Sequence, residues 1–166
     1  MAGPNALIIG ANRGLGLGLL KVFKEHGYNV FGTIRLQTRS DASFKDLEET
    51  GATIIDLDYL VEDTIAAAAK TFGEDRTLDI LVNCGGIGMD PELWLDTSAE
   101  QMIYKYHVMT VGPFLASKYF HPNLKKSKFA KIVYSMSVVV GIELKAANAQ
   151  FYVEVLKHQF LSIYSS

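Results

Sequence analysis

The residues best placed to do chemistry form a glycine-rich turn near the amino end of the chain. Gly10, Gly14 and Gly16 stand between the apolar run NALIIG and a stretch whose pattern predicts a helix. Glycines permit a tight turn, and they let backbone amides approach a pyrophosphate at the positive end of the helix. A glycine pattern is stronger evidence for dinucleotide binding when a strand precedes it and a helix follows it, as is expected here. The pattern predicts a dinucleotide-binding turn, and a structural turn without a ligand is the alternative.

Arg35, at the end of the second expected strand, indicates the kind of nucleotide. NAD-binding proteins usually place an acidic residue there for the ribose hydroxyls, whereas an arginine nearby accommodates the 2′-phosphate of NADP. No acidic residue follows until Asp41, and Arg13 and Arg39 are candidates to join Arg35. Guanidinium groups suit phosphate because they donate in a planar fork. NADP(H) is therefore expected if any cofactor is bound, and a solvated arginine without a cofactor is the alternative.

Short apolar runs alternate with helical patterns along the chain, and these elements would position the turn. The expected strands span residues 5–10, 29–35, 53–58, 78–86 and 130–139. The expected helices span residues 15–27, 41–51, 61–73 and 98–126, followed by a last helical segment. Asp41 is expected to cap the second helix and Pro113 to kink the fourth. The rhythm predicts an α/β fold over residues 1–166, a Rossmann-like doubly wound parallel sheet of about five strands.

Taken together, these motifs resemble the short-chain dehydrogenase/reductase family. The resemblance rests on the GxxxGxG spacing in GANRGLG, the strand ending TIR, the Leu-Asp pair after the third strand, and LVNCGG. The chain is most similar to the C-factor-like, NADP-type members. The resemblance covers essentially the whole chain but only about the amino-terminal two thirds of a typical member, so the chain is expected to be a carboxy-terminally truncated one.

The resemblance implies a set of cofactor-binding residues. The glycines would hold the pyrophosphate, Asn12 and Arg13 would line the adenosine phosphate, and Asp58 would accept a hydrogen bond from the adenine amino group. Residues 83–86 would stand for the family's Asn-Asn-Ala-Gly, from which Cys84 and Gly85 depart. The implied set is Gly10, Asn12, Arg13, Gly14, Leu15, Gly16, Arg35, Asp58, Asn83 and Gly85.

The resemblance also implies a catalytic tetrad of asparagine, serine, tyrosine and lysine. Ser137 matches the serine, whereas Met109 occupies the asparagine position and has no amide to hold a relay water. Tyr152 and Lys157 lie five residues apart, roughly 140° around a helix, although residues four apart share a face. The acid–base pair is therefore expected to be broken, unless the helix begins one residue later or carries a π-bulge. His107, beside Met109, is a further candidate polar group, although a lone histidine is more often not catalytic.

The chain ends before the part of the family that contacts the nicotinamide half of the cofactor. The fifth strand would then be an exposed edge, and the apolar side chains of the last helix would lie uncovered: Phe151, Val155, Phe160 and Ile163. Exposed edges and apolar patches usually bind a partner, so a homodimer or swapped assembly through this side is expected. An inactive gene fragment or splice form is the alternative.

Composition excludes several other classes of protein. With 166 residues, 20% charged residues and a net charge of −2, the chain is expected to be one globular domain without an electrostatic footprint for nucleic acid or anionic membrane. The single cysteine, Cys84, cannot form an internal disulfide, and no apolar stretch reaches the roughly 20 residues that span a bilayer. No signal peptide is evident, and no residue set has metal-ligand spacing. A soluble, cytoplasmic protein acting on a small molecule is expected.

The sequence leaves three functions open. The favoured one is an enzyme repurposed for non-hydride chemistry on a small, polyketide-like metabolite, by cyclisation, isomerisation or dehydration, with Ser137, Tyr152, Lys157 and His107 as its polar groups. The second is an NADP-dependent carbonyl reductase or alcohol dehydrogenase that uses Ser137, Tyr152 and Lys157. The third is a non-catalytic NADP-binding or dimerising module. The first is preferred narrowly, because the pocket is expected to persist while the tetrad is not.

Overall fold

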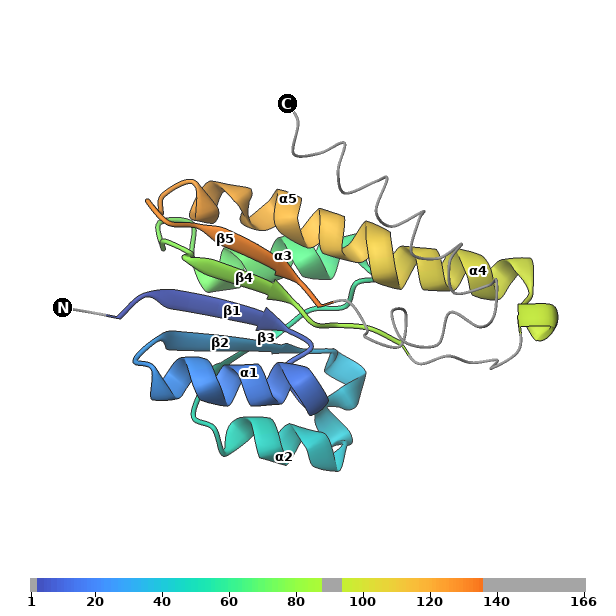
Figure 1. Cartoon of the computed structure of the whole chain (residues 1–166), viewed down its shortest axis with the longest axis horizontal. Coiled ribbons are helices and arrows are strands. Elements are labelled where there is room, and N and C mark those ends of the chain that lie inside the picture. Colours follow the sequence, from blue (N-terminus) through green and yellow to red (C-terminus); the bar gives the residue numbers. More distant parts are fainter. Residues whose placement is uncertain (1–2, 88–93, 136–166) are drawn as a thin grey trace, which may run out of the picture. The chain divides into compact units, whose positions relative to one another are not determined.

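A computed structural model describes residues 3–87 and 94–135, and these residues form one five-stranded parallel sheet (Figure 1). The strand order is β3-β2-β1-β4-β5. The strands are β1 (Asn5–Ile9), β2 (Asn29–Ile34), β3 (Thr53–Asp56), β4 (Ile80–Asn83) and β5 (Lys131–Tyr134). The predicted fold class is confirmed, with strands that end earlier than the apolar runs do. Within the described residues β5 pairs with β4 alone and is an edge of the sheet.

Helices cover both faces of the sheet. The α-helices are α1 (Gly14–Glu25), α2 (Ala42–Glu48), α3 (Glu62–Phe72), α4 (Ala99–Tyr106) and α5 (Gly112–Leu124). Helices α1 and α2 lie on one face, and α3 and α5 lie on the other (Figure 1). Residues 3–87 and 99–134 belong to one compact unit, which contains all of these elements. A short 3-10 helix at Trp94–Asp96 belongs to a second unit.

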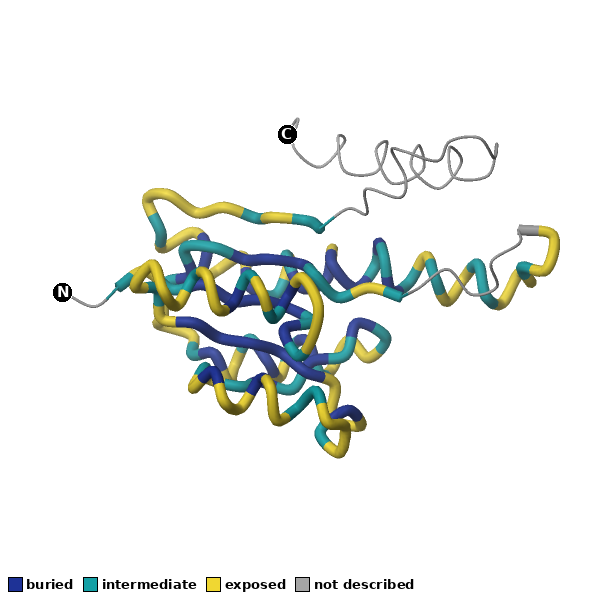
Figure 2. The backbone as a smooth tube through the Cα atoms, turned by 60° about the horizontal axis from the view of Figure 1, so that its bottom comes forward, coloured by how far each residue is buried: buried dark blue, intermediate teal, exposed yellow. Residues whose placement is uncertain are grey.

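The central strand β1 is buried on both faces, because neighbouring side chains point to opposite sides of the sheet. Leu7 and Ile9 join the cluster under α3 and α5, and Ala6 and Ile8 join the cluster under α1 and α2. Figure 2 shows the central strands as buried tubes, whereas the helices alternate between buried and exposed turns. This two-sided burial is the reason that the strands are continuous apolar runs rather than alternating ones.

The helix predicted over residues 98–126 is interrupted by a π-helical segment, His107–Val111, between α4 and α5. Pro113 was expected to kink the helix, and it lies at the start of α5. A proline has no backbone N–H, and its ring clashes with the carbonyl four residues earlier, which here belongs to Met109. The wider π turn is consistent with this clash, so the irregularity falls before the proline rather than at it.

The ends of the first helices follow the sequence signals in part. Gly27 and Gly51 have φ angles of 81° and 67°, in the left-handed region that favours glycine, and each lies just beyond the end of a helix. Asp41 occupies the N-cap position of α2, as predicted, but its side chain makes no capping hydrogen bond within the described chain. A 3-10 helix, Leu36–Ser40, precedes it and was not predicted. Among the described residues, no helix is long and apolar enough to cross a membrane.

Asn123 provides a test of how this fold is held together at the amino edge of the sheet. Its buried side-chain amide donates to the backbone carbonyls of Gly73 at 2.8 Å and Arg76 at 2.7 Å, which joins α5 to the segment after α3. We expect Asn123→Ala to lower the free energy of unfolding by about 1–3 kcal/mol, since it removes two hydrogen bonds made by a buried side chain. Urea unfolding measures the change.

Asn29→Ala is the matched control for this measurement. Asn29 also donates to two oxygens, those of Gly3 and Asn5, but it is exposed, so water can replace the lost partners. We expect a change of less than about 0.5 kcal/mol. A change for Asn123→Ala of less than about 0.5 kcal/mol as well would show that the Asn123 bonds do not stabilise the fold.

Candidate dinucleotide-binding site

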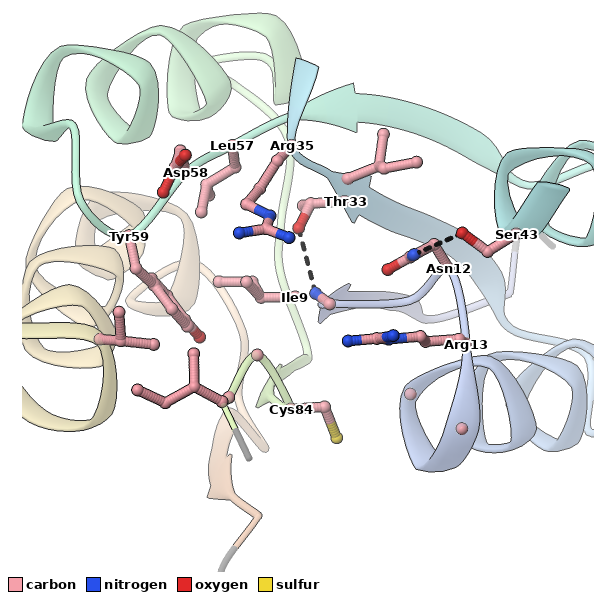
Figure 3. A pocket seen from close by; sticks show the side chains of 18 of the residues that line it. Ile9, Asn12, Arg13, Thr33, Arg35, Ser43, Leu57, Asp58, Tyr59 and Cys84 are labelled. Carbon is pink, nitrogen blue, oxygen red and sulfur yellow. Dashed lines mark hydrogen bonds between the residues drawn. The ribbon is translucent and has the colours of Figure 1, made fainter. Parts of the chain in front are cut away.

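A cavity of about 310 Å³ lies at the carboxyl ends of the strands. Its walls come from the ends of β1, β2 and β4, the start of α1, the start of α2 and the loop before α3, together with part of α4. Parallel doubly wound sheets bind ligands at this edge, where the strand order reverses, and here the reversal lies between β1 and β4. Figure 3 shows side chains from these elements around the cavity.

The predicted cofactor-binding residues gather at this cavity, with one exception. Those that line it are Gly10, Asn12, Arg13, Gly14, Leu15, Gly16, Arg35, Asp58 and Gly85. Asn83 does not line it, and lies buried behind the wall with 4% of its surface exposed. Residues that lie far apart in the sequence therefore meet at one site.

Backbone closeness explains why the turn after β1 needs glycines. Gly10 has a φ of 78°, and a Cβ on it would lie 2.8 Å from the Cα of Gly85. A Cβ on Gly16 would lie 2.1 Å from the carbonyl oxygen of Gly10. Real Cβ atoms do not come so close to backbone atoms, so the turn, the start of α1 and the loop after β4 could not pack in this way with side chains at these positions.

The amino end of α1 lines the cavity, and its free backbone N–H groups could bind an anion. Arg13 is the N-cap residue, its side chain makes no capping hydrogen bond within the described chain, and the first turn holds no acidic residue. The first backbone N–H groups of a helix lack partners inside the helix and carry partial positive charge. A phosphate group at this place would receive hydrogen bonds from those amides.

Two arginine side chains add full positive charge to the same cavity. Figure 3 shows the guanidinium groups of Arg13 and Arg35 extending into the cavity from different sides. Neither forms an ion pair with any residue that the structure describes. Arg39, the third candidate, is not at the cavity, because its Nε lies 2.8 Å from Oδ1 of Asp56 and its guanidinium packs over the ring of Phe44. The expectation for Arg39 is therefore corrected.

Hydrogen bonds hold the turn against its neighbours. The backbone N–H of Gly10 donates to Oγ1 of Thr33 at 3.3 Å, and that of Ala11 donates to the carbonyl of Thr33 at 3.1 Å. The side-chain amide of Asn12 donates to Oγ of Ser43 at 2.9 Å (Figure 3). Ser43 and Thr33 both line the cavity and were missed, because their nearness to the turn follows from the pairing of β1 with β2 and from the placing of α2.

Asp58 lies at the cavity wall, and both oxygens of its carboxylate accept hydrogen bonds from other residues of the chain. One oxygen accepts from the backbone N–H of Leu60 at 3.0 Å, and the other accepts from Nε2 of Gln37 at 3.0 Å. The first bond is an Asx-type turn that shapes the loop before α3. A carboxylate oxygen has further lone pairs, so Asp58 keeps the capacity to accept from a ligand.

Tyr59, which no local sequence motif indicates, closes one end of the cavity. It is 6% exposed, and its hydroxyl donates to Oδ1 of Asn83 at 2.7 Å. Burial, above all, raises the pKa of Tyr59 well above its ordinary value, and Cys84 and Tyr134 raise it further through charge repulsion. The hydroxyl therefore stays protonated and remains a donor. The Nδ2 of Asn83 has no partner among the described residues.

The predicted catalytic residues fall mostly outside the described part of the chain. Ser137, Tyr152 and Lys157 lie outside the described residues, as do Phe151, Val155, Phe160 and Ile163, which the sequence placed on an expected last helix. His107 is half-buried in the π-helical segment and is not among the described residues that line the cavity, whereas Tyr104 and Val108 are. Met109 lies near Gly86, since a Cβ on that glycine would lie 3.5 Å from the methionine sulfur.

The chain matches the family model of the short chain dehydrogenase over residues 4–152. The chain belongs to this family. It is 33% identical to an oxidoreductase of Bacillus subtilis, YxjF, over 86% of its own length and 57% of that protein's. It is 31% identical to the oxidoreductase UcpA of Salmonella typhimurium, over 83% of its length and 53% of that protein's. The chain thus spans just over half the length of these relatives.

A solved structure shares the fold of this short-chain dehydrogenase. A putative short-chain dehydrogenase/reductase from Burkholderia multivorans has a TM-score of 0.79 and 22% sequence identity, over 96% of this chain and 71% of the other. At that identity the likeness concerns the fold alone. The family membership rests on the match to the family model and on the sequence relatives.

Two glycines of α1 test the packing of the turn. We expect Gly16→Ala to lower the free energy of unfolding by about 1–3 kcal/mol or more, because the methyl group would overlap the Gly10 carbonyl. Gly18→Ala is the control: apart from the backbone of its own helix and its chain neighbours, no described atom lies within 4 Å of its Cβ position. Alanine in a helix is more stable than glycine by about 0.5–1 kcal/mol. Thermal unfolding of both variants would show opposite shifts, and parallel shifts would contradict this view of the turn.

Proposed function

We propose that this short-chain dehydrogenase binds NADP(H) and is an oxidoreductase acting on a carbonyl or alcohol group of a small molecule. The observation that carries the proposal is the meeting of Arg13 and Arg35 at a cavity whose floor is the glycine turn. The relative from Burkholderia multivorans is a structure with bound NADP, and the two sequence relatives are oxidoreductases. These names favour the reductase alternative over the non-hydride chemistry that the sequence had favoured.

The residues of the cavity fit the parts of this cofactor. The glycine turn and the amino end of α1 offer backbone N–H groups to a pyrophosphate, in a space that a Cβ on Gly10 or Gly16 would fill. Arg35, at the end of β2, stands where NAD-binding proteins place an acidic residue, and a guanidinium there suits a 2′-phosphate. Asp58 is the candidate to accept from the adenine amino group.

When bound, NADPH supplies the hydride, and the chain's own residues hold the substrate and donate a proton. Ser137 would hold the substrate oxygen and Tyr152 would donate the proton to it. Lys157 would lower the pKa of the tyrosine only if a later helix start or a π-bulge brings the two side chains to one face. A proton donor must reach the oxygen before its pKa matters, and these residues lie outside the described part of the chain. Their roles, and the homodimer, are therefore part of the proposal.

Arg35 tests the choice of nucleotide. We expect Arg35→Ala to weaken NADPH binding by about ten- to a hundredfold, since a charge-assisted contact to the 2′-phosphate is lost, and to leave NADH binding within about threefold. Isothermal titration with each nucleotide measures both constants. Arg39→Ala is the matched control, because Arg39 is paired with Asp56 away from the cavity and its removal leaves the phosphate contacts in place.

The outcome separates NADP(H) binding from other uses of the cavity. Equal losses of NADPH and NADH affinity in Arg35→Ala would show that the arginine does not contact the 2′-phosphate. Binding of neither nucleotide by the unmodified chain would overturn the proposed function.

Turnover tests whether the chain does hydride chemistry. With NADPH and a panel of aldehydes and ketones, we expect a fall in absorbance at the nicotinamide band, and a loss of about a hundredfold or more in rate for Tyr152→Phe. The same variant should bind NADPH with unchanged affinity, which serves as its control. Conversion of a substrate without consumption of nucleotide would contradict the proposal and favour the non-hydride alternative.

A further inference from the structure

We propose that Tyr59 and Gly85 form a matched pair that positions the β4 side of the nucleotide cavity. The proposal rests on the proposed function, since it assigns Tyr59 as a positioning residue for nucleotide binding. The ring of Tyr59 occupies the space that a side chain at position 85 would need. Its hydroxyl donates to Asn83, the last residue of β4, which lies two residues before Gly85. In this view, Gly85 is a glycine because position 59 is a tyrosine.

The first evidence is the distance between the ring and the loop after β4. A Cβ on Gly85 would lie 2.6 Å from Cε2, 3.2 Å from Cδ2 and 3.4 Å from Cζ of Tyr59. Contacts under about 3 Å do not occur for real Cβ atoms, and the ring cannot swing aside, because it is 6% exposed. An alanine at position 85 would therefore displace either the ring or the loop.

The second evidence is that the ring is fixed from two further directions. On its other side, a Cβ on Gly112 would lie 2.3 Å from the Cβ of Tyr59 and 2.5 Å from its Cγ. The start of α5 can therefore pack against Tyr59 only because residue 112 is a glycine. At its tip, the hydroxyl donates to Oδ1 of the buried Asn83 at 2.7 Å. A side chain held by a hydrogen bond and by close packing on two sides has one position. The fixed ring of Tyr59 therefore determines where the loop after β4 can lie.

The pair explains a departure from the family pattern. In the Asn-Asn-Ala-Gly pattern of the family, Gly85 stands at the place of the alanine. The missing methyl group does not leave a hole here, because the aromatic ring fills the space. The change at position 85 is therefore compensated, and the wall of the cavity beside Gly10 is kept.

A double-mutant cycle tests the coupling between the two positions. We expect Gly85→Ala to raise the dissociation constant for NADPH by about tenfold, and to raise it by less than about twofold when Tyr59→Val is already present. Valine lacks all of the ring atoms that the new methyl group would meet. The constants are measured by titration well below the melting temperature of every variant.

Gly112→Ala gives the cycle a geometric control. Its methyl group would meet the Cβ of Tyr59, which valine retains, so we expect Tyr59→Val to rescue Gly85→Ala but not Gly112→Ala. If Gly85→Ala alone cannot be purified, recovery of soluble protein by Tyr59→Val in that variant and not in Gly112→Ala decides in the same way. Rescue of both variants, or of neither, would overturn the proposal.

Asn123→Ala separates positioning from a loss of stability. It is expected to lower the melting temperature through bonds far from the cavity walls, without a change in NADPH affinity. Gly85→Ala should change both. If Gly85→Ala lowers only the melting temperature, or changes neither quantity, Tyr59 does not position the nucleotide site.

The same measurements distinguish the two proposals. If the unmodified chain binds neither nucleotide, the proposed function is wrong. The role of Tyr59 in nucleotide binding is then wrong too, even if the melting temperatures show that Tyr59 and Gly85 are coupled. An unmodified chain that binds NADPH, together with Gly85→Ala binding equally well, would leave the proposed function standing and overturn the pair.

Discussion

The contact between two backbone segments, the turn after β1 and the loop after β4, is the constraint on which this site depends. The two segments meet without side chains between them, since a Cβ on Gly10 would lie 2.8 Å from the Cα of Gly85. The pairing of β1 with β4 brings them to the same edge of the sheet, and the buried strands fix that pairing. The amino end of α1 then opens beside both segments, which gives the cavity its partial positive charge.

The cationic groups of the cavity are the two arginines that no described carboxylate pairs with, and they share its walls with Asp41 and Asp58. Arg39 is neutralised by Asp56, whereas Arg13 and Arg35 extend into the cavity without an ion pair to any described residue (Figure 3). Two guanidinium groups without a carboxylate partner repel each other, and an anionic ligand between them would relieve that repulsion. The proposed preference for a phosphate-bearing nucleotide would therefore depend on the whole edge of the sheet rather than on one residue.

The fold could be predicted from the sequence, because burial on both faces makes each strand of a parallel sheet an apolar run. The glycine turn and Arg35 could be predicted as well, since both follow strands directly. Tyr59, Ser43 and the pairing of Arg39 could not, because each depends on a neighbour from another element that no local pattern names. The π-helical segment His107–Val111 had a weak signal in Pro113, which was interpreted as a kink in a regular helix.

That π-helical segment has a consequence for how the chain tolerates change. A π turn holds about one residue more than an α turn, so α5 is rotated by roughly 100° from where an unbroken continuation of α4 would place it. With this rotation Val108, which also lines the cavity, joins Leu115 and Phe120 in one buried cluster. Loss of a single residue here would restore a regular helix and turn Leu115 and Phe120 by about 100° relative to α4, away from that cluster. Length, more than side-chain identity, is what this stretch must keep.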